Sequence, residues 1–80
     1  MPEIRLLQTE HCSLCDQAFE VLLGTPVVAS LTLVTVDIAY DDALLAQYGE
    51  HIPVLLLGEH ALQWPFTATD VTAFVQNVLE

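Results

Sequence analysis

The first part of the chain combines the spacing of a strand with the spacing of a helix. Residues 3–8, EIRLLQ, predict a short strand. After a loop, apolar residues recur at helical spacing and predict a helix over residues 13–23. Gly24 and Pro26 end this helix. The residues expected in its buried stripe are Leu14, Ala18, Val21 and Leu22, widened by Phe19 and Leu23.

The middle of the chain predicts a second strand and a short helix. Residues 31–38, LTLVTVDI, are rich in β-branched side chains and carry apolar residues on both faces. This pattern favours a central strand that is covered on both sides rather than an edge strand. Asp41 or Asp42 can cap the short helix DALLAQY, which ends at Gly49.

The last third predicts a hairpin followed by a helix. Residues 54–57, VLLL, are too few for a helix, and residues 58–59, Gly-Glu, fit a two-residue turn. Residues 60–62 would form the returning strand. Thr67 or Thr69 caps a final helix. Its predicted core stripe contains Val71, Phe74, Val75 and Val78.

The resulting order is β-α-β-α-β-β-α, an α/β arrangement. A helix that joins two strands implies a parallel pair, and the late hairpin adds an antiparallel strand, so we expect a four-stranded mixed sheet. No repeat, linker or low-complexity tract interrupts the pattern. We therefore expect one domain over residues 1–80.

The charge of the chain is strongly acidic, with Arg5 as the single Lys or Arg against eleven acids and a net charge of −10. Because phosphate binding needs cations, we expect neither nucleic acid nor an anionic membrane as partner. The acidity either keeps the protein soluble or steers it toward a basic partner. No apolar run reaches the roughly 20 residues of a membrane span, and no signal peptide is visible. We expect a cytoplasmic monomer, in which a structural disulfide would be unusual.

Both cysteines lie in the segment TEHCSLCDQA, at the junction between the first strand and the first helix. Cys12 and Cys15 fall on one helix face, close enough for a disulfide to form with little backbone movement. Cys12 lies in the first turn, where free amide groups and the helix dipole favour the thiolate and lower the thiol pKa. Cys15 lies one turn deeper and suits a resolving role. This placement suggests a thioredoxin-like redox motif.

The neighbours of the pair modify this picture. His11, if protonated, would stabilise the Cys12 thiolate further, whereas nearby Glu10 and Asp16 oppose it. Ser13 is explained by helix capping and has no catalytic role beyond shaping the motif.

Three other interpretations stay open at this point. The cysteines could be two small buried hydrophobes. A second possibility is a metal site, for which His11, Cys12, Cys15 and His51 supply N and S ligands. A third is a redox-inert interaction module that uses Trp64 or the edge at Pro53, although the simpler interpretation of Trp64 is that it packs under the final helix beside Pro65.

Two motifs carry a family resemblance: C-S-L-C-D at residues 12–16 and I-P-V at residues 52–54. With the order of elements over residues 3–79, they resemble a glutaredoxin-like family of the thioredoxin superfamily, and more narrowly its small bacterial members with a C-x-L-C-D motif. The resemblance implies a thioredoxin-like, glutaredoxin-like fold. In that motif Ser13 and Leu14 are expected to shape the site.

The resemblance also implies roles. Cys12 would be the nucleophile and Cys15 the resolving thiol of a thiol–disulfide oxidoreductase that acts on protein or small thiol disulfides. Pro53 would be a cis-proline beside them, and Ile52 would present its backbone to an extended substrate strand. The paired glycines and paired acids with which glutaredoxins hold glutathione are missing from GEHALQWPFTATD, which keeps Asp70. We therefore expect no resident cofactor and keep glutathione as a candidate reductant.

Overall fold

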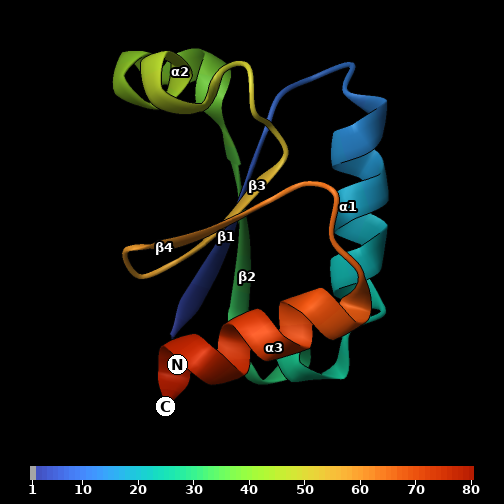
Figure 1. Ribbon diagram of the computed structural model, residues 1–80. Helices are drawn as coiled ribbons and strands as arrows, with labels where there is room; N and C mark the ends of the chain where they lie inside the picture. The colour runs from blue at the N-terminus through green and yellow to red at the C-terminus, as the bar shows by residue number, and fades with distance from the viewer. Residues whose placement is uncertain (1) are drawn as a thin grey trace.

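The computed structural model describes residues 2–80 (Figure 1). The predicted β-α-β-α-β-β-α order and four-stranded mixed sheet are confirmed. The structure also contains two short 3-10 segments that the sequence did not predict, because they are too short to show a periodic pattern of apolar residues. The elements are β1 (Glu3–Gln8), α1 (Ser13–Leu23), η1 (Pro26–Ser30), β2 (Thr32–Asp37), η2 (Ile38–Tyr40), α2 (Asp42–Tyr48), β3 (Val54–Leu57), β4 (His60–Gln63) and α3 (Ala68–Leu79).

The strands follow the order β2-β1-β3-β4. β1 is parallel to β2 and antiparallel to β3, and β3 is antiparallel to β4. In this register Gln8 lies beside Asp37, while Val54 lies between Leu7 and Gln63. The ends of β1, β2 and β4 therefore meet the start of β3 at one end of the sheet, here called the site end.

The prediction that residues 31–38 form a central strand is wrong, because β2 lies at the edge and pairs with β1 alone. The apolar side chains on both faces of β2 have another cause. Leu33 packs against the core cluster on one face of the sheet, and Val36 packs against the cluster on the other face. The pattern reports two covered faces, not two neighbouring strands.

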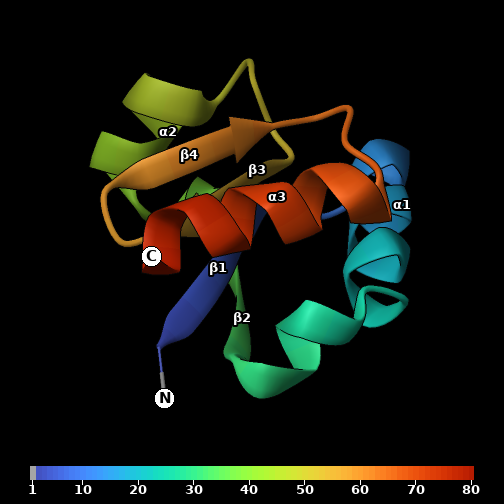
Figure 2. The same cartoon turned by 60° about the horizontal axis from the view of Figure 1, so that its bottom comes forward.

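Helices cover the two faces unequally. α1 and α3 lie on one face, and α2 lies on the other near the site end (Figures 1 and 2). The larger core includes Ile4, Leu6, Ala18, Leu22, Leu55, Val71 and Val75. The smaller core contains Leu7, Ile38 and Val54, with Leu44 and Tyr48 of α2 packed against them. Over residues 2–80, no helix has the length and apolar character needed to cross a bilayer.

The buried stripe of α1 differs from the predicted one. Cys15, Ala18 and Leu22 are buried, whereas Leu14 is 46% exposed and Leu23 is 66% exposed. Because successive helical residues are rotated by about 100°, a stripe that begins at Cys15 leaves its neighbour Leu14 outside the core. The burial of Cys15 thus sets the rotation of the helix.

The other two helices begin where the sequence predicts. In α2, Asp41 is the N-cap and its Oδ1 accepts from the Leu44 N–H at 3.0 Å. In α3, Thr67 and Asp70 form a reciprocal capping box. Val71 and Val75 are then buried, with Phe74 and Val78 packed at the margin of the core.

Candidate active site

A disulfide joins Cys12 and Cys15 at the head of α1, with their Cα atoms 5.2 Å apart. The two sulfur-bearing residues differ in access. Cys15 is 1% exposed and belongs to the inner stripe of α1, whereas Cys12 is half-buried and precedes the helix. The three-residue separation therefore makes Cys12 the outer cysteine and Cys15 the inner cysteine of the pair.

Cys12 is itself the N-cap of α1. Its Sγ accepts the backbone N–H of Cys15 at 3.1 Å, in the position where a Ser, Thr or Asp oxygen more often accepts. The expectation that Ser13 caps the helix is wrong: Ser13 is the first residue inside α1 and is exposed. Because the N-terminus of a helix carries a partial positive charge, the sulfur of Cys12 lies where a negative charge is favoured.

The turn before Cys12 depends on His11, whose φ is 56°. This left-handed conformation is uncommon for residues other than glycine, although histidine is among the more tolerant types. It redirects the chain from β1 into α1. His11, Ser13 and Leu14, the sequence neighbours of the half-buried Cys12, are all exposed.

Pro53 lies at the same end of the sheet as the cysteine pair. The Ile52–Pro53 peptide bond is cis, as the resemblance implies. Val54 pairs with Leu7, so Pro53 lies one step beyond, beside the end of β1 from which the chain runs to Cys12. The loop before β3 and the loop after β1 both lie at the top of Figure 1. Pro53 is buried and Ile52 half-buried.

Two contacts hold this segment against β4. The Trp64 N–H donates to the Pro53 carbonyl oxygen at 3.1 Å, and Gln63 Nε2 lies 3.1 Å from His51 Nδ1. The Trp64–Pro65 bond is also cis. The sequence signals neither contact nor this second cis bond, because both depend on the pairing of β3 with β4 and on loop geometry.

The remaining candidate residues have other surroundings. Within residues 2–80, no three His, Cys, Asp or Glu side chains are grouped as a metal site would need, which gives the His/Cys metal interpretation no support.

Trp64 is half-buried and packs edge-to-face on Phe66, with ring centres 5.0 Å apart. It thus packs against the larger core, as the alternative interpretation of Trp64 predicts.

Acidic side chains dominate the site end. A groove of about 390 Å³ between the start of α1 and β2 is lined by Gln8, Asp16, Phe19, Glu20 and Thr35, which include two carboxylates. Five further acids lie at or just beyond the element ends that meet at the site end: Glu10, Asp37, Asp41, Asp42 and Glu50.

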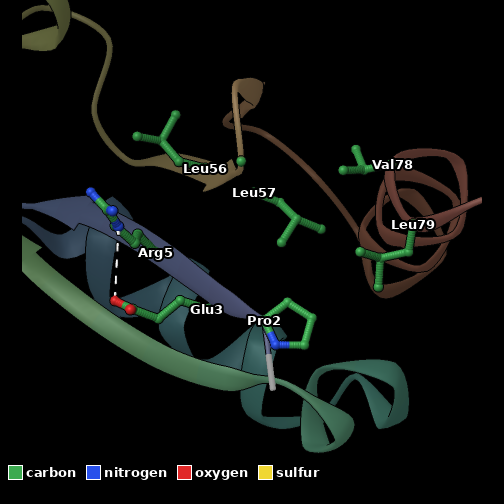
Figure 3. Close-up of a pocket in the computed structure, with 8 residues that line it drawn as sticks. Pro2, Glu3, Arg5, Leu56, Leu57, Val78 and Leu79 are labelled. Atoms are coloured by element: carbon green, nitrogen blue, oxygen red, sulfur yellow. Dashed lines mark ion pairs between the residues drawn. The ribbon is translucent and has the colours of Figure 1, made fainter.

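Arg5, the single Lys or Arg of the sequence, lies in the middle of β1 and not at the site end. Glu3 and Arg5 line a groove of about 380 Å³ together with Gly58 and the end of α3. Figure 3 shows the Arg5 and Glu3 side chains joined by a dashed line that marks their ion pair. Arg5 Nε is 3.9 Å from Glu3 Oε1, and both side chains are more than half exposed. The site end therefore has no Lys or Arg to offset its acids.

Comparison with known proteins agrees with this geometry. Residues 3–76 match the family described as Glutaredoxin-like domain (DUF836). The X-ray structure of target protein XcR50 from X. campestris has 35% sequence identity and a TM-score of 0.81, covering 92% of this chain and 96% of that chain. Its solution structure gives 35% identity and a TM-score of 0.79, with 96% and 95% covered.

A more distant structure shares the fold. Thioredoxin 1 from Thermosipho africanus TCF52B has 14% identity and a TM-score of 0.68, covering 96% of this chain and 93% of that chain. No match was found among curated proteins. With the family match over residues 3–76, these similarities show that the chain belongs to the glutaredoxin-like family of thioredoxin-fold proteins.

Proposed function

We propose that this protein is a thiol–disulfide oxidoreductase in which Cys12 attacks the substrate and Cys15 resolves the intermediate. The observation that carries the proposal is the unequal pair at the head of α1. Cys12 is half-buried and caps the helix with its sulfur, whereas Cys15 is 1% exposed and one turn inward. A substrate can reach the first sulfur but not the second.

The exchange takes two displacement steps. The Cys12 thiolate attacks one sulfur of a substrate disulfide, forms a mixed disulfide and releases the other substrate sulfur as a thiolate. The Cys15 thiolate then attacks Cys12 Sγ, which forms the Cys12–Cys15 disulfide and releases the second substrate thiolate. The substrate gains two electrons and the dithiol loses two, with protons taken from solvent by the released thiolates. Both electrons reside on the protein's own sulfurs, so the exchange needs no resident cofactor.

The head of α1 favours Cys12 for the first step. In the reduced protein the Cys15 N–H that now meets Cys12 Sγ at 3.1 Å would donate to a thiolate. The helix dipole adds to this stabilisation, so both would favour the Cys12 thiolate in the reduced protein. Cys15 suits the second step, in which it attacks the Cys12 sulfur of the mixed disulfide.

The surroundings support binding of an extended substrate segment. Ile52 precedes the cis-proline at the site end, where its backbone would pair with an extended substrate strand. Leu14 is 46% exposed beside the cysteine pair and offers an apolar contact. An apolar contact with Leu14 suits a peptide side chain rather than a small anion.

The electrostatics favour a basic or neutral disulfide over glutathione. Glutathione carries a net negative charge and needs cationic or amide partners. The site end has acids and no Lys or Arg, and its groove includes Asp16 and Glu20. A substrate whose disulfide is flanked by Lys or Arg would be attracted to this end.

A trapping experiment tests the proposal. Cys12→Ser removes the attacking sulfur and should abolish reduction of a basic peptide disulfide. Cys15→Ser should instead accumulate the mixed disulfide between Cys12 and the peptide, which mass spectrometry detects as an adduct. Adduct formation at Cys15 in the Cys12→Ser protein, with none at Cys12 in the Cys15→Ser protein, would contradict the assigned roles.

A further inference from the structure

The segment that leads into β3 contains one residue whose backbone is unpaired. Among the residues that the structure describes, no hydrogen bond engages the N–H or the carbonyl oxygen of Ile52. Its side chain packs against the smaller core. Free N–H and C=O groups are what an added strand pairs with. Ile52 can therefore offer its backbone to another chain while its side chain stays anchored.

The end of β4 holds the two neighbours of Ile52 and lies beside this segment (Figure 2). On one side, the Trp64 N–H donates to the Pro53 carbonyl oxygen at 3.1 Å. On the other side, Gln63 Nε2 lies 3.1 Å from His51 Nδ1. We call these two contacts, which bracket Ile52, the β4 clamp. Since Gln63 and Trp64 are consecutive residues, one strand end sets the position of the whole segment.

The Gln63 contact is the part of the clamp that side chains make. Gln63 and His51 are both exposed and lie 12 residues apart in the chain. Their contact borders a cleft of about 210 Å³ that Gln47, Tyr48 and Ala61 also line, without a carboxylate, Lys or Arg. Because both side chains are exposed, burial of apolar surface does not explain the contact. Its effect is to tie the loop after α2 to β4.

We propose that Gln63 is a positioning residue for the substrate strand. By holding His51, it keeps the Ile52 backbone where an extended segment that carries the substrate disulfide can pair with it. Gln63 lies on β4, which β3 separates from β1 and the loop to Cys12, so it acts through His51 and not on the reacting sulfurs. The role rests on the proposed oxidoreductase function and specifies its substrate, a disulfide within an extended peptide.

The expected consequence is a loss of binding without a loss of chemistry. When Gln63 is removed, His51 loses its side-chain partner, and the segment must be ordered when the substrate binds. That cost weakens peptide binding. The attack by Cys12 on a bound disulfide is unaffected, because the contact does not reach the head of α1. A change of this kind raises the half-saturating concentration and leaves the limiting rate unchanged.

The test uses the reduced protein in single-turnover kinetics, so that no external reductant is needed. Formation of the Cys12–Cys15 disulfide is followed with a basic peptide disulfide and with bis(2-hydroxyethyl) disulfide, which has no peptide backbone. In Gln63→Ala we expect the half-saturating peptide concentration to rise about two- to fivefold, the lower part of the range for one lost hydrogen bond. The limiting rate with the peptide and the rate with bis(2-hydroxyethyl) disulfide should stay unchanged. Equal changes with both substrates would overturn the proposal.

Gln47→Ala is the matched control. It removes the same kind of exposed side chain from the same cleft, but Gln47 Nε2 contacts the Tyr48 hydroxyl at 3.2 Å and not the segment before β3. Substitutions at such exposed positions leave the fold intact. The control should keep the kinetics of the unmodified protein with both substrates. An effect on the peptide as large as that of Gln63→Ala would overturn the proposal.

A double-mutant cycle tests whether Gln63 acts through His51. If the two side chains act as one contact, His51→Ala should weaken peptide binding about as much as Gln63→Ala, and the double variant should weaken it no further. A double variant whose effect is the product of the two single effects would overturn the coupling.

The same kinetics separate this role from the proposed function. An unmodified protein that reduces neither substrate would contradict the oxidoreductase function and the positioning role together. If the unmodified protein reduces both substrates and Gln63→Ala binds the peptide equally well, the positioning role alone is overturned.

Discussion

The backbone N–H of Cys15 meets Cys12 Sγ at a distance of 3.1 Å, in the first turn of α1. One contact therefore serves two purposes. It caps the helix, and it places a donor where the negative charge of a Cys12 thiolate would develop. The inner cysteine contributes its amide to the outer one while its own side chain is buried in the core.

The first prediction concerns the ionisation of Cys12. In the Cys15→Ser protein, which keeps the amide donor, we expect the Cys12 thiol to have a pKa below the ordinary value of about 8.5. A lowered pKa means that the thiolate persists as pH falls below that value. Thiolate absorbance followed against pH measures it, with the urea-unfolded variant as control. Equal pKa values in the folded and unfolded protein would refute the stabilisation.

The second prediction concerns substrate charge. Asp16→Asn and Glu20→Gln each remove a carboxylate from the groove beside the motif. We expect each to slow reduction of a basic peptide disulfide by about two- to fivefold, the size of an exposed ion pair worth about 0.5–1 kcal/mol. Each should also speed reduction of glutathione disulfide. Stopped-flow rates at low salt measure both.

The matched control is Glu59→Gln, which makes the same charge change in the β3–β4 turn at the opposite end of the sheet. It should leave both rates nearly unchanged. If the Glu59 variant shifted the rates as much as the Asp16 variant, net charge rather than the groove would determine substrate preference.

The third prediction tests the observed rotation of α1. Leu22 is 1% exposed and Leu23 is 66% exposed, although both were predicted within one stripe. Leu22→Ala should lower the free energy of unfolding by about 2–5 kcal/mol because it leaves a cavity. Leu23→Ala should change it by about 0.5 kcal/mol or less. Urea denaturation of both variants gives the comparison, and equal losses would contradict this rotation.

Local signals predicted most of the fold. Gly24, the caps Asp41 and Thr67, and the alternation of apolar residues set the limits of the helices and strands, because these depend on neighbouring residues. The edge position of β2 depends on which strand pairs with which, and apolar residues on both faces cannot distinguish two covered faces from two neighbouring strands. The rotation of α1 likewise depends on how Cys15 packs.

The sequence predicted part of the candidate site. The C-x-x-C spacing points to the paired sulfurs, whereas the cis bond at Pro53 was implied by the family resemblance and not by the proline alone. The sequence did not identify Cys12 as the cap in place of Ser13, since a sulfur seldom has that role. The Gln63 contact with His51 joins residues from different elements and has no local signature.

The redox equilibrium of the cysteine pair tests the central proposal most directly. The protein is equilibrated in a series of thiol–disulfide buffers, and the Cys12–Cys15 dithiol and disulfide fractions are counted by mass spectrometry after alkylation. We predict a reversible two-electron transition within the physiological range, about −180 to −320 mV. A pair that stays entirely dithiol or entirely disulfide across that range would contradict the proposed oxidoreductase function.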